Sequence, residues 1–194
     1  MKWLFAAVVV LSIASENASA PNRAESGLVN GVYSDSELGF RYVPPAQMRD
    51  VTLNDRAEMQ RRAAVLHRST DADLLLAMSS GPDDTDPDWH SVGIETLSRA
   101  SWPDVDDFHA ETRMNASMAR GALSVSENRR VTFSSQPFVA TEFQLHEDSI
   151  TKYSKVYTTI RRGRLISFAF SGNSPEQVDK MVETMKSLSF AGPN

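Results

Sequence analysis

The clearest pattern along the chain is the alternation of apolar and polar residues in its last third. Residues 139–145 alternate, and residues 150–160 alternate again. A period of two is typical of strands with one buried face. Residues 165–170 (LISFAF) are apolar on both faces, as expected of a central strand, and Arg162-Gly163 makes a tight turn before them. The pattern predicts neighbouring antiparallel strands joined by hairpins.

Three other segments have the helical period of 3.6 instead. They are residues 54–68, residues 105–120, with an imperfect stripe that ends at Met118, and residues 174–188. The last has the strongest start signal, because Ser174 precedes a proline and a glutamate in the first turn. Its apolar stripe is expected to cover the sheet, and it consists of Val178, Met181, Val182, Met185 and Leu188.

Shorter patterns complete the predicted order of elements. Strands are expected at residues 28–33, 39–43, 73–80, 90–97 and 131–134, the last of them cut by Pro137. The resulting order, ββ-α-ββ-α-ββββ-α, has no strict alternation of strand and helix. It predicts an α+β fold in which a mainly antiparallel sheet is covered by helices, an α/β/α sandwich.

The first 20 residues have the features of a signal peptide. Lys2 is followed by an apolar run, and the run is followed by the small-x-small site Ala18-Ser19-Ala20. Pro21 disfavours cleavage after Ala20, so cleavage after Ser15 is the alternative; a core strand or a retained anchor is the other interpretation of this segment. We expect a signal peptide at 1–20, a flexible tail at 21–27 and one domain at 28–190. The mature protein is then periplasmic or secreted, without a membrane span.

The composition of the chain argues against some classes of partner and excludes some kinds of chemistry. The 194 residues include 20 Lys+Arg and 25 Asp+Glu, a net charge of −5, and no cysteine. The acidic balance argues against a nucleic-acid partner. The lack of cysteine excludes disulfides, thiolate metal sites and cysteine nucleophiles.

Three local features, in their order, resemble the PsbP-like superfamily. They are Tyr33 followed by residues 38–45 (LGFRYVPP), the hairpin that ends in residues 162–170, and the Ser174-capped helix that closes with residues 187–190. The resemblance covers residues 28–190 and implies an antiparallel sheet between helices. Its members are mostly non-catalytic: photosystem accessory subunits, a Ran-binding transport factor and exported bacterial proteins. It therefore implies no catalytic residues, and no motif here supports transfer of those partners.

An acidic loop at residues 81–88 (GPDDTDPD) carries the best candidate for chemistry. Asp84, Asp86, Asp88 and Glu95 reproduce positions 1, 3, 5 and 12 of an EF-hand calcium loop. Trp89 stands where that loop needs glycine, and the flanks resemble strands rather than helices. A solvated hairpin loop is the plainer interpretation, and Ca²⁺ is the only cofactor that the sequence suggests.

No catalytic motif accompanies this loop. His67, His90, His109 and His146 show no metal-ligand spacing, and the nucleophile motifs GxSxG and SxxK are absent. The favoured hypothesis is an exported, non-catalytic binding or accessory module with an unidentified protein partner in the cell envelope. The alternatives are a small secreted hydrolase with a His/Asp site, for which His90 and the aspartates are the first candidates, and a calcium-dependent binding module that uses residues 83–95.

Overall fold

The computed structural model describes residues 26–65, 72–100, 102–147 and 149–192. Its helices are α1 (Thr52–Val65), α2 (Val105–Met118) and α3 (Pro175–Val182), and the 3-10 helix η1 (Glu183–Ser187) continues α3. Its strands are β1 (Ser26–Val29), β2 (Val32–Asp35), β3 (Phe40–Tyr42), β4 (Arg49–Asp50), β5 (Ala72–Ser79), β6 (His90–Ser98), β7 (Ala122–Val125), β8 (Arg129–Phe133), β9 (Gln136–Glu147), β10 (Ile150–Arg161), β11 (Arg164–Gly172) and β12 (Ser189–Phe190).

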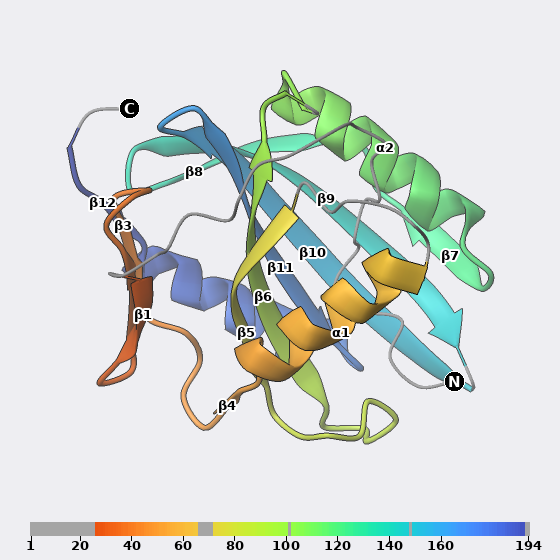
Figure 1. Ribbon diagram of the computed structural model, residues 1–194. Coiled ribbons are helices and arrows are strands. Elements are labelled where there is room, and N and C mark those ends of the chain that lie inside the picture. The colour runs from red at the N-terminus through yellow and green to blue at the C-terminus, as the bar shows by residue number, and fades with distance from the viewer. Residues whose placement is uncertain (1–25, 66–71, 101, 148, 193–194) are drawn as a thin grey trace.

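The main sheet has the strand order β4-β5-β6-β11-β10-β9-β7, with β8 also paired to β9 (Figure 1). Each of these pairings is antiparallel. The predicted hairpin joins β10 to β11 through Arg162 and Gly163, whose φ angles of 46° and 75° lie in the left-handed region. The prediction of an α+β fold with a mainly antiparallel sheet is confirmed.

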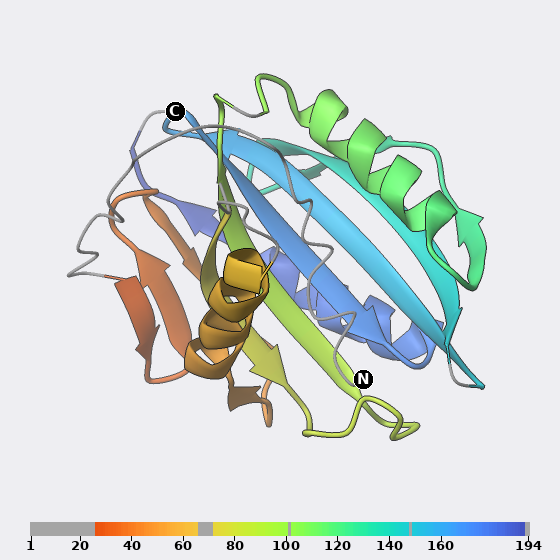
Figure 2. The same ribbon diagram turned by 45° about the vertical axis from the view of Figure 1, so that its right-hand side comes forward.

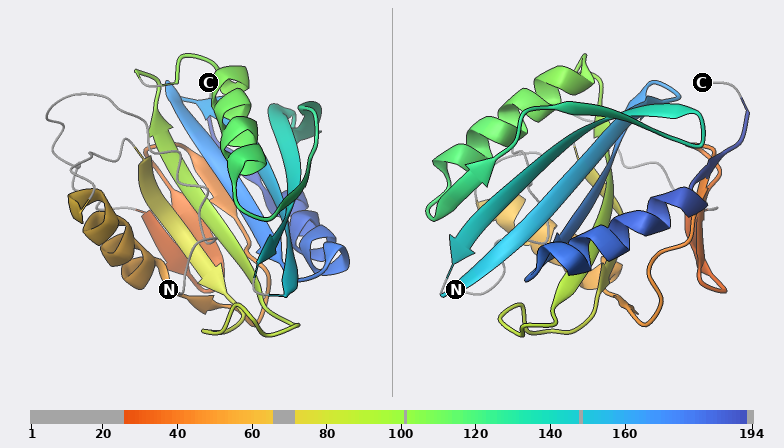
Figure 3. Two further views of the ribbon diagram at one scale, coloured as in Figure 1. Left: turned by 90° about the vertical axis from the view of Figure 1, so that its right-hand side faces the viewer. Right: turned by 180° about the vertical axis from the view of Figure 1, so that it is seen from behind.

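The two faces of this sheet are covered differently. Helices α1 and α2 lie on one face and α3 lies on the other (Figure 3). The residues of β11 separate accordingly: Leu165 joins the apolar cluster beneath α2, whereas Ile166 and Phe168 join the cluster beneath α3. Alternation along one strand thus supplies both cores.

A second sheet, of order β1-β2-β3-β12, covers part of the α3 face. Aromatic side chains make this contact, because the Phe40 and Tyr42 rings meet the Phe168 ring edge-on at centroid distances of 5.9 and 5.6 Å. The prediction that the sheet is covered by helices was therefore overstated. The aromatic side chains of β3 are buried against the main sheet, so strands cover this part of the face in place of a helix.

The helix predicted to start at Ser174 is confirmed. The Ser174 side chain accepts a hydrogen bond from the Gln177 backbone N–H, and Gln177 Oε1 accepts one from the Ser174 backbone N–H, which makes a capping box. Met181 and Met185 are 3% and 0% exposed. The helix becomes a 3-10 helix at Glu183, within the predicted span.

Several predicted boundaries were wrong. Residues 28–33 are not one strand, because Asn30 and Gly31 take positive φ angles and turn the chain between β1 and β2. Residues 26 and 27 of the predicted tail belong to β1. Pro137 lies inside β9, near its start, and does not end the preceding strand. The break between β8 and β9 falls earlier, at the turn where Ser134 and Ser135 take positive φ angles. Met118 is 68% exposed, and the stripe of α2 ends at Ala116.

Predictions for the start of the chain fall outside the described residues. They include the signal peptide, both cleavage sites and most of the tail. Within the described ranges, no helix is long and apolar enough to cross a membrane.

Candidate functional site: the acidic tip groove

A groove of about 680 Å³ opens at one end of the sheet, and we call it the acidic tip groove. Its walls come from residues 45–47, from parts of the segment 80–90, and from the α3–η1 segment. Asp83, Asp86 and Asp88 contribute acidic side chains, and Lys180 contributes a basic one. Pro45 and Pro82, which are half-buried and exposed, add apolar surface, so the groove combines carboxylates with an apolar wall.

The acidic loop is organised by its own side chains. Asp83 Oδ1 accepts hydrogen bonds from the Thr85 backbone N–H at 3.1 Å and from Thr85 Oγ1 at 2.7 Å. Asp86 Oδ1 accepts from the Asp88 backbone N–H at 2.8 Å. Such bonds from Asp to the backbone two residues on are characteristic of Asx turns. Two consecutive turns therefore fold the loop compactly.

Two amide side chains hold the loop from the direction of α3. Asn173 Nδ2 donates to the backbone carbonyls of Asp84 and Asp86, at 3.1 and 2.6 Å. Gln177 Nε2 donates to the Pro87 carbonyl at 3.1 Å, while Gln177 also completes the capping box of α3. The helix start and the loop are thus one connected unit, and the groove between them is preformed.

A buried lysine fixes the remaining aspartate of the loop. Lys152 Nζ on β10 lies 2.6 Å from Asp84 Oδ2 and 5.5 Å from the centre of the Trp89 ring. The side chains of Lys152 and Asp84 are only 5% and 18% exposed. Asp84 is therefore committed to an internal ion pair and does not line the groove.

The four predicted calcium ligands occupy different places. Asp86 and Asp88 lie together at the groove wall, whereas Asp84 turns to Lys152. Glu95 lies within β6, where it is opposite Leu74 and Ser167 in the neighbouring strands. In the described part of the chain, no three acidic or histidine side chains gather in a way that could hold one metal ion. Calcium binding stays a prediction.

The predicted His/Asp site depends on what the histidine rings contact. His90 lines the groove, and its Nδ1 lies 2.8 Å from the backbone carbonyl of Asp88, not from its carboxylate. His146 Nδ1 lies 3.4 Å from Thr151 Oγ1. His67 falls outside the described residues. The contact that His90 makes orients the ring but does not join it to an acid in the way a catalytic pair requires.

No family model and no curated protein matches the chain. The solved structure of the cyanobacterial PsbP protein CyanoP from Synechocystis sp. PCC 6803 superposes with a TM-score of 0.53 at 15% identity. The match covers 89% of this chain and 100% of CyanoP. The chain has a PsbP-like fold. The predicted resemblance is thus confirmed at the level of the fold.

Two other solved structures match with lower TM-scores than CyanoP. A protein of unknown function from Pseudomonas aeruginosa has a TM-score of 0.47 at 12% identity, over 63% of this chain and 84% of the other. LpqN, which is involved in cell envelope biogenesis of Mycobacterium tuberculosis, has a TM-score of 0.43 at 8% identity, over 64% and 80%.

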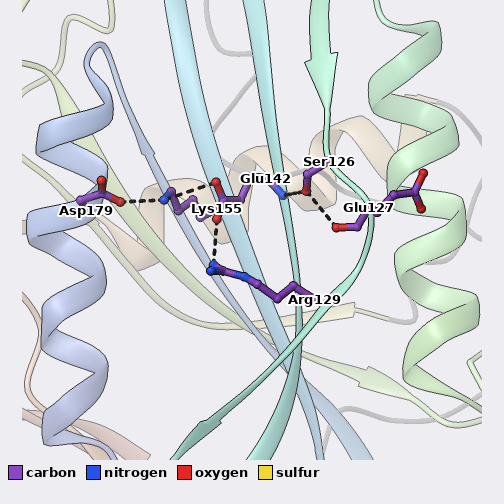
Figure 4. A network of polar contacts seen from close by, with 6 residues as sticks. All are labelled: Ser126, Glu127, Arg129, Glu142, Lys155 and Asp179. Atoms are coloured by element: carbon purple, nitrogen blue, oxygen red, sulfur yellow. Dashed lines mark hydrogen bonds and ion pairs between the residues drawn. The ribbon is translucent and has the colours of Figure 1, made fainter.

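Within the PsbP-like fold, a polar network joins α3 to the main sheet (Figure 4). Lys155 Nζ on β10 lies 2.6 Å from Asp179 Oδ1 of α3 and 3.4 Å from Glu142 Oε2 of β9. Arg129 Nη2 reaches the other oxygen of Glu142 at 2.9 Å. The network crosses three strands and one helix, and it helps to fix the helix that forms one wall of the groove.

Local sequence patterns do not mark the residues that position this site. The partners of Lys152, Asn173 and Gln177 are 68, 87 to 89 and 90 residues away, so no short motif contains them. Nor does a local pattern mark the burial of His109, which is fully buried with Nδ1 2.7 Å from Thr141 Oγ1. Burial lowers the pKa of His109 to about 4, although the charge of Asp106 opposes this, so the ring is neutral at pH 7.

Proposed function

We propose that this protein is an exported, non-catalytic binding module that holds a positively charged segment of a partner protein in its acidic tip groove. The observation that carries the proposal is the tie between the acidic loop and α3. Asn173 and Gln177 hold three carbonyls of the loop, so the groove needs little ordering when a partner binds. A preformed site avoids the entropy that a flexible loop would lose on binding.

The chemistry of the walls indicates what would bind. Asp86 and Asp88 offer carboxylates at the groove, and Pro45 and Pro82 offer apolar contact. A segment with lysine or arginine beside an apolar residue complements both features. Lys180 lies at the same groove and would favour a partner that also carries an acidic group.

Binding can be tested without knowing the partner. A photo-crosslinking amino acid at Gln47, which lines the groove, should capture an envelope protein in the native cells. The same amino acid at Ser124, an exposed residue of β7, is the matched control. Replacing Asp86 and Asp88 together by asparagine should reduce the Gln47 crosslink about tenfold, since charge-assisted bonds are lost. Equal capture from Gln47 and Ser124, or no effect of the double variant, would refute the proposal.

Export is the other part of the proposal. The signal features at residues 1–20 support it. Mass spectrometry of the periplasmic or secreted fraction should find a mature chain beginning near Pro21 or Glu16. A soluble cytoplasmic protein that retains Met1 would contradict export.

A further inference from the structure

The acidic tip groove carries unpaired charges of both signs. The loop between β5 and β6 projects beyond the end of the main sheet (Figure 2), and it brings the exposed Asp88 to one wall of the groove. The opposite sign comes from the exposed Lys180 on the α3 wall. Among the described residues, neither the Asp88 carboxylate nor the Lys180 ammonium takes part in a hydrogen bond or an ion pair. Each charge is therefore available to a ligand.

The neighbours of Lys180 on α3 hold the fold together, whereas Lys180 does not. The Gln177 amide donates to the Pro87 carbonyl at 3.1 Å. Asp179 pairs with Lys155 at 2.6 Å. A lone cation beside the carboxylates of the groove weakens the attraction for a ligand that carries positive charge only. It favours a ligand that carries a carboxylate as well, because each charge of the ligand then meets one of the opposite sign.

A second donor without an acceptor lines the same groove. Trp89 is 2% exposed, and its Nε1–H has no hydrogen-bond partner in the described part of the chain. The backbone holds this residue between the loop and the start of α3, because its N–H donates to the Asp86 carbonyl at 2.9 Å and its carbonyl accepts from the Asn173 N–H at 3.3 Å. Buried indole N–H groups normally have an acceptor. An oxygen atom of a ligand would supply one, which again indicates a carboxylate.

The volume of the groove limits the ligand to a short piece of chain. About 680 Å³ lies within the roughly 300–1,000 Å³ that is typical of small-molecule sites, so the groove holds a few residues and not a folded domain. The terminal residue of a chain carries its carboxylate on the backbone, a fixed few bonds from its own side chain. A basic C-terminal residue therefore presents both charges with fewer rotatable bonds to order than two separate side chains would need.

We propose that the acidic tip groove recognises the C-terminal residue of a partner protein, a lysine or arginine with a free carboxylate, which rests on the proposed function that the groove binds a basic segment. The side chain of this terminal residue pairs with Asp86 and Asp88, and its carboxylate pairs with Lys180. An apolar residue before it lies against Pro45 and Pro82. Capture of a chain end by its carboxylate is a recurring mode of peptide recognition.

The probe is the peptide acetyl-Ala-Pro-Ala-Lys with a free C-terminal carboxylate, and the same peptide with a C-terminal amide is its match. Calorimetric titration of the full chain should give about tenfold tighter binding of the carboxylate form, because the amide form loses a charge-assisted bond. Lys180→Met should abolish this difference and leave the amide form bound. Lys186→Met is the control and should preserve the difference, since Lys186 is 73% exposed on η1 and does not line the groove.

The outcomes distinguish recognition of a chain end from binding of any basic segment. Equal binding of the two forms, lost for both when Asp86 and Asp88 are replaced by asparagine, would overturn recognition of the carboxylate and leave the proposed function standing. A preference for the carboxylate form that survives in Lys180→Met would also overturn it. So would equal binding of acetyl-Ala-Pro-Ala-Ala with a free carboxylate, because the basic side chain would then contribute nothing. No binding of either lysine peptide would refute both the chain-end recognition and the proposed function.

Discussion

Lys152 Nζ lies 2.6 Å from Asp84 Oδ2, and these two residues are 68 positions apart in the sequence. The pair joins the start of β10 to the loop that forms one wall of the groove. With the lysine side chain 5% exposed and the aspartate 18% exposed, the ion pair is largely shielded from water. Removing one partner would leave a charge that is costly to bury.

Lys152→Met should therefore lower the free energy of unfolding by about 3 kcal/mol. Lys155→Met is the control, because Lys155 Nζ lies at the same 2.6 Å from Asp179, whose side chain is 62% exposed, and 3.4 Å from Glu142, whose side chain is 37% exposed. Both ion pairs are screened by water, so their loss should cost about 1 kcal/mol. Urea denaturation measures both. A loss in Lys152→Met no larger than in the control would show that burial does not strengthen this contact.

Met185→Asp tests the facing of the final helical segment. Met185 is fully buried in the cluster beneath α3, so a carboxylate there would be surrounded by apolar side chains. Unfolding free energy should fall by about 3 kcal/mol or more. Lys186→Asp, one residue on, alters a side chain that is 73% exposed, and we expect a change within about 0.5 kcal/mol. Thermal or urea melts giving equal effects for both variants would contradict the observed facing.

Glu95 should make stability depend on pH. Its pKa is about 7 in the folded chain against 4.5 for the ordinary carboxyl, so the folded state binds a proton more tightly than the unfolded state. Its contribution to stability is complete below pH 4.5 and is lost as the pH rises through 7. Glu95→Gln should flatten this part of the stability–pH curve and stabilise the protein at pH 8. An unchanged curve, measured by urea denaturation from pH 4 to 8, would contradict the assigned burial.

Adding calcium tests the prediction that the acidic loop is a calcium site. With Asp84 paired to Lys152 and Glu95 in β6, we expect millimolar Ca²⁺ to shift the melting temperature no more than NaCl of equal ionic strength. A larger rise that disappears in Asp86→Asn would instead establish a calcium site, because ligands that prefer the folded state raise its stability. Differential scanning fluorimetry is sufficient for the comparison.

Local patterns predicted most of the elements, since each of them depends on neighbours a few residues away. The β10–β11 hairpin followed from alternation and the Arg162-Gly163 turn, and α3 followed from its cap and stripe. The short strands β4 and β12, two residues each, were not predictable. Strands of that length exist only because a partner strand is in place, so no local period marks them.

For the candidate site, the sequence by itself determined the composition and the turns of the acidic loop. The tertiary structure decided the direction of each side chain. It placed Asp84 against Lys152, left Asp86 and Asp88 at the groove, and carried Glu95 into the sheet. Spacing along the chain predicts a shared site only when the backbone between the residues curves around one point. Here β6 begins at His90 and extends away from the loop. Glu95, eleven residues after Asp84, is therefore carried away from the loop instead of meeting it at one site.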